Sequence, residues 1–379
     1  MELFFGIISG LVILVILVIV HELGHAIVAL RNGVVVEEFG IGFPPRAWKK
    51  KLKNGILLSV NWLPLGGFVK LQGEHDAARK KGDYGSATFM QKTRILLAGV
   101  VINWLFAVLL LTGLAIIGMP KVIPDQITIP SDSTVVQKPI ELVAITKGYP
   151  AEKAGLIVGD QIIRFANKEV PTVDRLIEIS KQNKGKDIYV VYSRNGSENT
   201  VRVTLRNDDK GGLFGASLGQ QEIVKSTWSA PIVGIATNAQ FTWLTLKGVG
   251  ELLSSLVNGF VLQFSFDQNV REQASSELNT VSDSVAGPIG ILGTIFPAAQ
   301  QAGMTQLILL TAIISVSLAV MNALPIPSLD GGRWFTMVMF RLLKKKLTMK
   351  REEKIQLIGF SILMGLVVLV TIADVSKLF

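Results

Sequence analysis

Two of the three histidines of the chain lie in one short segment, His21-Glu22-Leu23-Gly24-His25, directly after an uncharged run. Residues four apart share a helix face with Cβ atoms about 5–6 Å apart, so both imidazoles can bind one Zn²⁺ through bonds of about 2.0–2.1 Å. Glu22 then lies beside the metal, where it can take a proton from water and pass it to a leaving amine. The spacing predicts zinc-dependent peptide hydrolysis, with His21 and His25 as ligands and Glu22 as the catalytic base.

The alternative is that both histidines are ordinary polar residues at the end of a membrane helix. The intervening carboxylate of Glu22 argues against it, because an ionisable group near hydrocarbon is costly and usually functional.

A third ligand is needed, since catalytic zinc sites usually have three protein ligands and an open position. The chain has no cysteine, so the ligand must be His, Asp or Glu. His75 lies in a polar stretch typical of a solvated loop. Asp330 is the only carboxylate between Asp283 and Glu352, and we predict it to be the third ligand. The alternative for Asp330 is a helix N-cap or a turn residue ahead of two glycines.

The elements that carry these residues are predicted to be membrane spans. The chain has 379 residues, 49% hydrophobic and 18% charged, which excludes an ordinary soluble protein. The apolar runs long enough to cross a bilayer cover residues 3–20, 95–118, 307–324 and 355–373. A cleaved signal peptide is disfavoured, because the N-terminus carries Glu2 and no basic residue. The expected class is a polytopic α-helical membrane protein with four transmembrane helices.

Basic residues indicate the orientation of these spans. Residues 31–94 contain twelve Lys and Arg against five acids, and residues 344–354 contain six more basic residues. The positive-inside rule makes these loops cytoplasmic, and it puts both termini and residues 119–306 outside. Asp330 then lies on the same side as His21 and His25. Topology therefore explains the net charge of +9, and no motif points to a nucleic-acid partner.

An extracytoplasmic α+β domain is predicted at residues 123–219. Alternating stretches at 188–192 and 201–205, separated by Asn195-Gly196, predict a hairpin, and residues 172–182 predict an amphipathic helix. Residues 148–156, followed by Gly159-Asp160-Gln161-Ile162-Ile163, resemble a circularly permuted bacterial PDZ domain. Such domains bind C-terminal peptides by strand addition. The resemblance makes Gly212-Leu213-Phe214-Gly215 the carboxylate-binding loop; the alternatives are that this loop only closes the last strand and that the domain acts as a size filter.

Two further segments have a membrane-associated composition. Residues 56–71 are apolar and β-rich but are too often broken by turns for a spanning helix, and they contain Gly66, Gly67 and Phe68. Residues 228–266 are mostly uncharged, and we expect amphipathic helices on the outer membrane surface across residues 228–306. These helices would either gate substrate entry or anchor the PDZ insert.

Together these motifs resemble the site-2 protease family of intramembrane zinc metalloproteases. The residues that carry the resemblance are the H-E-x-x-H segment, the PDZ insert and the late segment Asn322-Ala323-Leu324-Pro325-Ile326-Pro327-Ser328-Leu329-Asp330-Gly331. More narrowly, the chain resembles the bacterial regulator of sigma-E protease subgroup, with one PDZ domain. The resemblance divides the membrane core into residues 1–118 and 307–379.

The resemblance implies roles for named residues. His21, His25 and Asp330 would bind zinc, and Glu22 would be the base. Asn322 would contact substrate backbone; its alternative role is to satisfy backbone opened by two nearby prolines. Residues 56–71 would form a membrane-reentrant β-loop in which Gly66, Gly67 and Phe68 meet the substrate; the alternative is a surface hairpin that turns at the two glycines.

The implied function is cleavage of single-span proteins in a bacterial plasma membrane. The substrates would be membrane-tethered anti-sigma factors and signal-peptide remnants, cut within the membrane after a first extracytoplasmic cut. Two other functions stay open: a catalytically silent PDZ scaffold, and a membrane-anchored zinc protease acting on soluble substrates.

Overall fold

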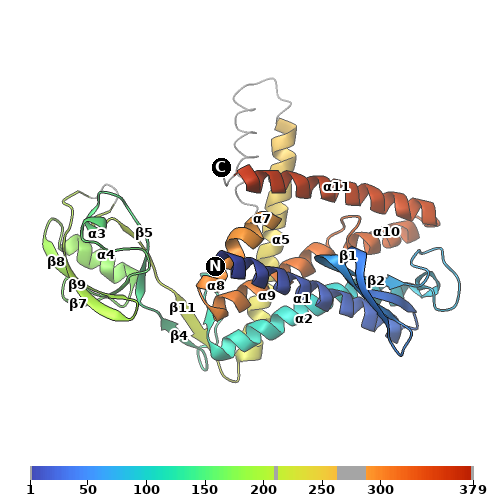
Figure 1. The fold of residues 1–379 in the computed structure, drawn as a ribbon, viewed down its shortest axis with the longest axis horizontal. Helices are drawn as coiled ribbons and strands as arrows, with labels where there is room; N and C mark the ends of the chain where they lie inside the picture. The colour runs from blue at the N-terminus through green and yellow to red at the C-terminus, as the bar shows by residue number, and fades with distance from the viewer. Residues whose placement is uncertain (1, 209–211, 263–286, 377–379) are drawn as a thin grey trace. The chain divides into compact units, whose positions relative to one another are not determined.

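Two compact units make up the chain (Figure 1). The computed structural model describes residues 2–208, 212–262 and 287–376. One unit comprises Met1–Leu114 and Pro231–Phe379, and the other comprises Ala115–Ala230. Residues 263–286 of the predicted surface segment 228–306 and the last three residues of the predicted segment 307–379 lie outside the described residues.

The first unit contains four helices that are long and apolar enough to cross a membrane. They are α1 (Glu2–Arg31), α2 (Phe89–Ile117), α9 (Met304–Ala323) and α11 (Met349–Ser376). The prediction of four spanning helices is confirmed among the described residues. Three of them begin or end beyond the uncharged runs, because the helix continues into polar flanking residues. In particular α1 extends to Arg31, so it carries both histidines of the H-E-x-x-H segment.

A β-hairpin follows α1 in the chain, formed by β1 (Val36–Lys51) and β2 (Leu57–Leu71). Both strands fold back on themselves, so that Gly40 pairs with Ser59 on one side and with Phe68 on the other. Residues 38–41 therefore lie between two arms of β2. The second arm follows a bend at Gly66, whose φ of +86° favours glycine. Residues 56–71 are β-structure as predicted, but their partner strand is β1, which the sequence did not predict; membrane reentrance stays a prediction.

Shorter helices and one long helix complete this unit. They are η1 (Tyr84–Ser86), α5 (Ala230–Leu262), α7 (Pro288–Gly290), the π-helical turn η2 (Ile291–Ile295), α8 (Phe296–Gln301) and α10 (Asp330–Leu342). Residues 230–262 form a single helix that packs on α2, because Trp104 Nε1 donates to Thr242 Oγ1 at 3.1 Å. Its location on the membrane surface stays a prediction.

The two sequence-adjacent spans α1 and α2 approach closely and lie side by side (Figure 1). A Cβ at Gly24 of α1 would lie 2.7 Å from the Ala98 carbonyl oxygen of α2. Around this contact, apolar side chains of α1, α2 and the hairpin share one core that includes Ala29, Phe39 and Ile95. The core fixes the H-E-x-x-H face of α1 against α2 and β2.

The second unit is a small α+β fold. Its larger sheet has the order β10-β5-β6-β8-β9, with β7 beside β6, and a smaller sheet has the order β3-β11-β4. The elements are β3 (Met119–Pro120), β4 (Thr134–Gln137), β5 (Ile140–Ile145), α3 (Pro150–Lys153), β6 (Gln161–Phe165), β7 (Lys168–Glu169), α4 (Val173–Gln182), β8 (Asp187–Arg194), β9 (Ser197–Thr204), β10 (Ala216–Gly219) and β11 (Glu222–Lys225).

Two predicted elements of this unit are confirmed. Strands β8 and β9 pair antiparallel through a turn in which Asn195 and Gly196 both have positive φ, as a two-residue type I′ turn requires. Helix α4 begins after Thr172, whose hydroxyl accepts from the Arg175 N–H and caps the helix. Its apolar face packs on the sheet through Leu176 and Ile179.

Candidate metal centre and its surroundings

Two histidines of α1 and an aspartate about 300 residues later in the chain meet in the first unit. The Asp330 Oδ2 atom lies 3.0 Å from His21 Nε2 and 3.1 Å from His25 Nε2, and the two Nε2 atoms lie 3.2 Å apart. Among the described residues, these three form the group that could hold a metal ion. Because α1 and the start of α10 supply them, the site links the first and last parts of the chain.

The spacing of these three atoms fits zinc. In a tetrahedral site with bonds of about 2.0–2.1 Å, ligand atoms are separated by about 3.3 Å. Each of the three measured separations lies within about 0.3 Å of that value. Two imidazoles and one carboxylate are also a ligand set that suits zinc. The arrangement can therefore hold a tetrahedral cation with its fourth position open.

Helix α2 orients one of the two imidazoles. His25 Nδ1 lies 2.7 Å from the carbonyl oxygen of Ile95 and donates to it in the tautomer that leaves Nε2 facing Asp330. Such a partner fixes the ring orientation and raises the basicity of a ligand histidine. The carbonyl belongs to Ile95, an apolar residue for which the amino-acid sequence predicts no such role.

A glycine of α2 makes room for both rings. A Cβ placed at Gly99 would lie 2.5 Å from His21 Cε1 and 2.5 Å from His25 Nε2. Any other residue at this position would displace the imidazoles. Gly99 was not predicted as a site residue, because a single glycine in an apolar helix carries no local signal of which neighbour it faces.

The predicted base lies against the β-hairpin. A Cβ at Gly67 would lie 3.5 Å from Glu22 Cγ and 3.1 Å from Val18 Cγ1, both on α1. The second arm of β2 therefore runs beside the carboxylate of the H-E-x-x-H segment.

The other two predicted hairpin residues, Gly66 and Phe68, take part in contacts between an aromatic ring and a glycine within the hairpin. A Cβ at Gly66 would lie 2.6 Å from the Phe43 ring, and the Phe68 ring lies over Gly40, where a Cβ would meet it at 2.3 Å. Gly66 is at a bend, as the surface-hairpin alternative expected, whereas Gly67 pairs with Ile41 inside the strand. Of the three predicted substrate-contacting residues Gly66, Gly67 and Phe68, Gly67 is the one that lies against Glu22.

The turn that presents Asp330 is tightly folded. A Cβ at Gly331 would lie 2.3 Å from the Ala323 carbonyl oxygen, and one at Gly332 would lie 1.9 Å from the Ile326 carbonyl oxygen. Asp330 is the first residue of α10, and the N-cap is Leu329 with no side-chain cap, so the N-cap alternative for Asp330 is wrong. The two glycines allow this start to fold back onto the end of α9.

Asn322 and His75 do not reach the three ligand atoms in this structure. Asn322 Nδ2 donates to the Leu318 carbonyl oxygen at 3.0 Å, within α9. His75 lies 3.8 Å from Glu353 Oε1 in a partly exposed loop. Contact of Asn322 with substrate stays a prediction.

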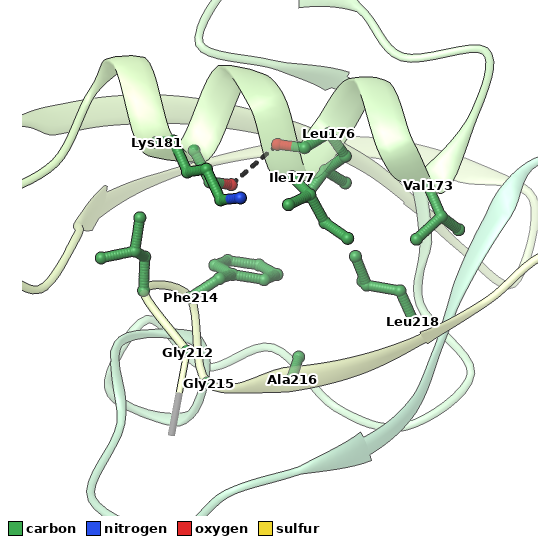
Figure 2. Close-up of a pocket in the computed structure, with 11 residues that line it drawn as sticks. Val173, Leu176, Ile177, Lys181, Gly212, Phe214, Gly215, Ala216 and Leu218 are labelled. Carbon is green, nitrogen blue, oxygen red and sulfur yellow. Dashed lines mark hydrogen bonds between the residues drawn. The ribbon is translucent and has the colours of Figure 1, made fainter. Parts of the chain in front are cut away.

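In the second unit, the predicted carboxylate-binding loop borders a cavity of about 430 Å³ (Figure 2). Gly212 and Gly215 have φ of +86° and +76°, while Leu213 and Phe214 are buried. Figure 2 shows Val173 and Ile177 of α4 above Leu218 of β10. Strand β10 is at the edge of its sheet, so a further strand can pair there. The cavity is mainly apolar, with a lysine, Lys181, at its rim.

An ion pair between the buried Asp160 and the partly exposed Arg194 links two parts of the second unit. Arg194 donates from two nitrogens to the Asp160 carboxylate, each at 2.7 Å, and the Ile157 N–H donates to it at 2.9 Å. Burial raises the pKa of Asp160, but these hydrogen bonds outweigh it and hold the pKa below its ordinary value. The pair joins the turn before β6 to β8.

The sequence comparisons cover almost the whole chain. A family model described as Peptidase family M50 matches residues 9–366. A Clostridium acetobutylicum protein named "Putative zinc metalloprotease CA_C1796" is 30% identical over 98% of each chain. The protein named zinc metalloprotease RasP from Geobacillus kaustophilus is 25% identical over 99% of this chain and 98% of its own.

Among solved structures, the PDZ domain of an SdrC-like protein from Listeria monocytogenes is 19% identical, with a TM-score of 0.20. It covers 21% of this chain and 86% of that chain. The PDZ assignment therefore stays a prediction from the sequence.

Proposed function

The chain belongs to peptidase family M50, the site-2 protease family, and from this we propose that it hydrolyses peptide bonds within the transmembrane segments of single-span proteins. Membership confirms three sequence predictions: the family, the class of zinc metalloprotease, and zinc as the cofactor. The prediction of a multi-pass membrane protein is confirmed, because the structure has four helices that are long and apolar enough to cross a membrane. The roles of individual residues, the substrates and the orientation in the membrane are proposals.

The observation that carries the proposal is the convergence of His21, His25 and Asp330 within zinc-binding distance of one another. These three residues would hold zinc, which when bound acts as a Lewis acid on the scissile carbonyl. Glu22 follows His21 directly on the same helix and lies against Gly67. It takes a proton from the attacking water and delivers it to the leaving nitrogen.

Strand β2 supplies a reason why an apolar helix could be cut here. A helical substrate hides its carbonyls in internal hydrogen bonds, so hydrolysis requires an extended segment at the site. The arm of β2 that contains Gly67 runs beside Glu22. A substrate that unwinds can pair with this arm by strand addition, and Asn322 would contact its backbone.

The basic loops support a site near the cytoplasmic side of a bacterial plasma membrane. Both termini and the second unit would then be extracytoplasmic, as the positive-inside rule predicts. We propose membrane-tethered anti-sigma factors and signal-peptide remnants as substrates, cut after a first extracytoplasmic cleavage. The product of the cut within the membrane would be a cytoplasmic fragment, as in regulated intramembrane proteolysis.

The cavity of the second unit supports a peptide ligand of the PDZ type. An extended C-terminus would pair with β10 and place apolar side chains against Ile177 and Leu218, with its carboxylate in the 212–215 loop. Its source would be the new C-terminus that the first cut creates. The alternative role, a size filter for uncut substrates, requires no ligand in this cavity.

The test uses the purified full chain in detergent with single-span substrates already shortened on the external side. Wild type and Glu22→Gln are compared for cleavage and for bound zinc. We expect cleavage within the span by wild type, inhibition by a zinc chelator, and a loss of at least about 10²-fold in Glu22→Gln despite bound zinc. Equal cleavage by both proteins would contradict the role of Glu22, and a folded wild type without zinc would favour the scaffold alternative.

A further inference from the structure

The last candidate span, α11, has one stripe that is covered by protein, close to the start of the helix. Glu352 and Gly359 are buried, and Ile355 and Gln356 are partly buried, whereas the residues between them are exposed. The spacing of these positions follows one face of a helix. Two of the four carry polar side chains, which are expensive in a spanning helix unless they have partners.

The first contact of this stripe is with the segment just before Asp330. Gln356 Oε1 accepts a hydrogen bond of 2.6 Å from the Ser328 N–H. A Cβ at Gly359 would lie 2.4 Å from the Pro327 carbonyl oxygen, so α11 and this segment touch backbone to backbone. Both contacts fall within three residues of the predicted ligand.

The hydrogen bond that the Ser328 N–H donates to Gln356 restrains an unfavourable backbone. Ser328 has a φ of +83°, a region that non-glycine residues rarely adopt and that persists only where the surroundings enforce it. The Gln356 Nε2 atom is buried with no partner among the described residues. The glutamine therefore makes its one described hydrogen bond to the strained residue of the Asp330 turn.

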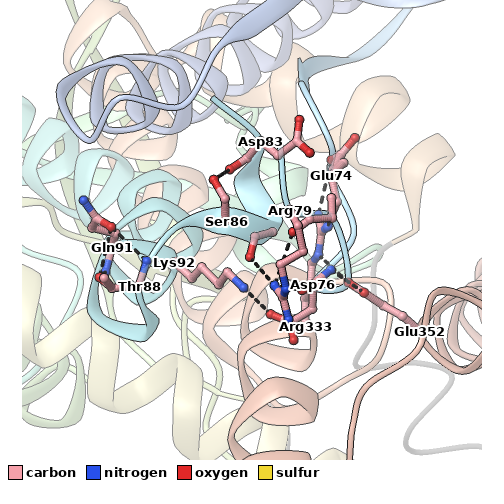
Figure 3. A network of polar contacts seen from close by, with 12 residues as sticks. Glu74, Asp76, Arg79, Asp83, Ser86, Thr88, Gln91, Lys92, Arg333 and Glu352 are labelled. Atoms are coloured by element: carbon pink, nitrogen blue, oxygen red, sulfur yellow. Dashed lines mark hydrogen bonds and ion pairs between the residues drawn. The ribbon is translucent and has the colours of Figure 1, made fainter. Parts of the chain in front are cut away.

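The second contact is with α10, one turn after Asp330 (Figure 3). Glu352, whose side chain is 4% exposed, accepts from Arg333 Nε at 3.3 Å and from the Asp76 N–H at 3.0 Å. Arg333 also pairs with Glu74 Oε1 at 3.2 Å, and its guanidinium lies 5.0 Å from the Tyr84 ring centre. This cluster holds the first turn of α10 to α11 and to the 74–84 loop.

We propose that Gln356 and Glu352 are positioning residues. Gln356 holds the backbone just before Asp330 and Glu352 holds the helix turn just after it, and together they set the affinity of the site for its divalent cation. The inference rests on the proposed metal site. Neither residue contacts the ligand atoms; each acts through the backbone or side chain of a residue within three positions of Asp330. Because α1 and α2 fix His21 and His25, movement of the turn that carries Asp330 changes the distances from the Asp330 carboxylate to the two histidine Nε2 atoms.

The experiment measures zinc affinity of the full chain in detergent by competition with a chromophoric chelator. Gln356→Leu removes the acceptor, Gln356→Glu restores an oxygen at the same place, and Glu352→Gln weakens the hold on Arg333. Ser361→Ala is the matched control, because the hydroxyl of this exposed serine of α11 donates within its own helix, to the Leu357 carbonyl oxygen. Supporting residues of ligands typically change metal affinity about 10–100-fold.

We expect Gln356→Leu and Glu352→Gln to bind zinc about tenfold or more weakly, with Gln356→Glu closer to wild type and Ser361→Ala unchanged. The visible spectrum of bound Co²⁺, which reports ligand geometry, should shift in the first two variants. The unfolding midpoint of the metal-free proteins separates this effect from general damage.

The inference is overturned if wild type binds zinc and Gln356→Leu binds it equally well, or if Gln356→Leu weakens binding no more than Ser361→Ala. A wild type that binds zinc without cutting any substrate would instead contradict the proposed function and leave the affinity comparison valid. A wild type that binds no zinc overturns both.

Discussion

Gly67 of β2 lies against Glu22 of α1, close enough that a Cβ at position 67 would reach within 3.5 Å of the Glu22 Cγ atom. The two residues are brought together by packing of the hairpin on the first span. The contact gives the carboxylate a neighbour of extended backbone instead of a side chain. It therefore joins the predicted base to the strand on which a substrate would be presented.

Replacing Gly67 by valine should separate this strand from Glu22. The new side chain would meet the Gly40 carbonyl oxygen and Val18 Cγ1 at 3.1 Å or less, so the strand must move away. We expect kcat/KM for a single-span substrate to fall about 10- to 100-fold, since small misplacements of a reacting group cost that much. Zinc content should stay at the wild-type level. A variant with full activity would show that the strand does not position the substrate.

Gly99→Ala should disturb the metal ligands directly. The added methyl group would lie 2.5 Å from His21 Cε1 and from His25 Nε2. We expect zinc content measured by atomic emission to fall to a small fraction of wild type, and activity to fall with it. Gly113→Ala is the matched control on the same helix, because a Cβ there would meet no atom within 4 Å in the part of the chain that the structure describes. Equal zinc content in the two variants would contradict the packing described for Gly99.

Gly332→Ala should open the turn that presents Asp330. A Cβ at this position would overlap the Ile326 carbonyl oxygen, 1.9 Å away, which no rotamer change can relieve because the clash is with backbone. We expect loss of zinc binding and a destabilised α10, seen as faster amide hydrogen exchange of that helix. Gly365→Ala on α11 should change neither quantity, because among the described residues no atom lies within 4 Å of a Cβ at this position.

The second unit should lose stability in acid through Asp160. Its folded pKa is lowered below the ordinary 3.8 because the hydrogen bonds from Arg194 and Ile157 outweigh the effect of burial. Its contribution is therefore complete above that ordinary value and is lost as pH falls through the lower folded pKa. Asp160→Asn should destabilise the unit by about 2 kcal/mol at pH 7.

The measurement for Asp160 is hydrogen exchange of β6 and β8 in the full chain between pH 7 and the lowest pH at which it stays soluble. Asp160→Asn should flatten the acid dependence of their protection. Asp187→Asn serves as the control, because its ion pair with Arg202 is on the surface and exposed pairs contribute little. If protection of β6 and β8 depends on pH in Asp160→Asn as it does in wild type, then other carboxylates cause the loss of stability in acid.

The sequence by itself determined the spans and the peptidase family, and it predicted the candidate ligand residues. Local spacing was sufficient for His21 and His25, because a four-residue separation places two side chains on one helix face whatever surrounds the helix. Asp330 was predicted from topology, since few carboxylates exist in the apolar last part of the chain. Apolar runs, the Asn195-Gly196 turn and the cap at Thr172 are likewise local signals.

Only the tertiary structure decided what surrounds these residues. Strand β1 was not predicted, because Val36–Lys51 contains two prolines and a lysine run and shows no regular alternation. The role of Gly99 and the stripe of α11 that includes Gln356 depend on helix packing between segments tens to hundreds of residues apart. Periodicity along the chain says which face of a helix is buried; it does not say which backbone that face meets, and here that backbone is the turn that holds Asp330.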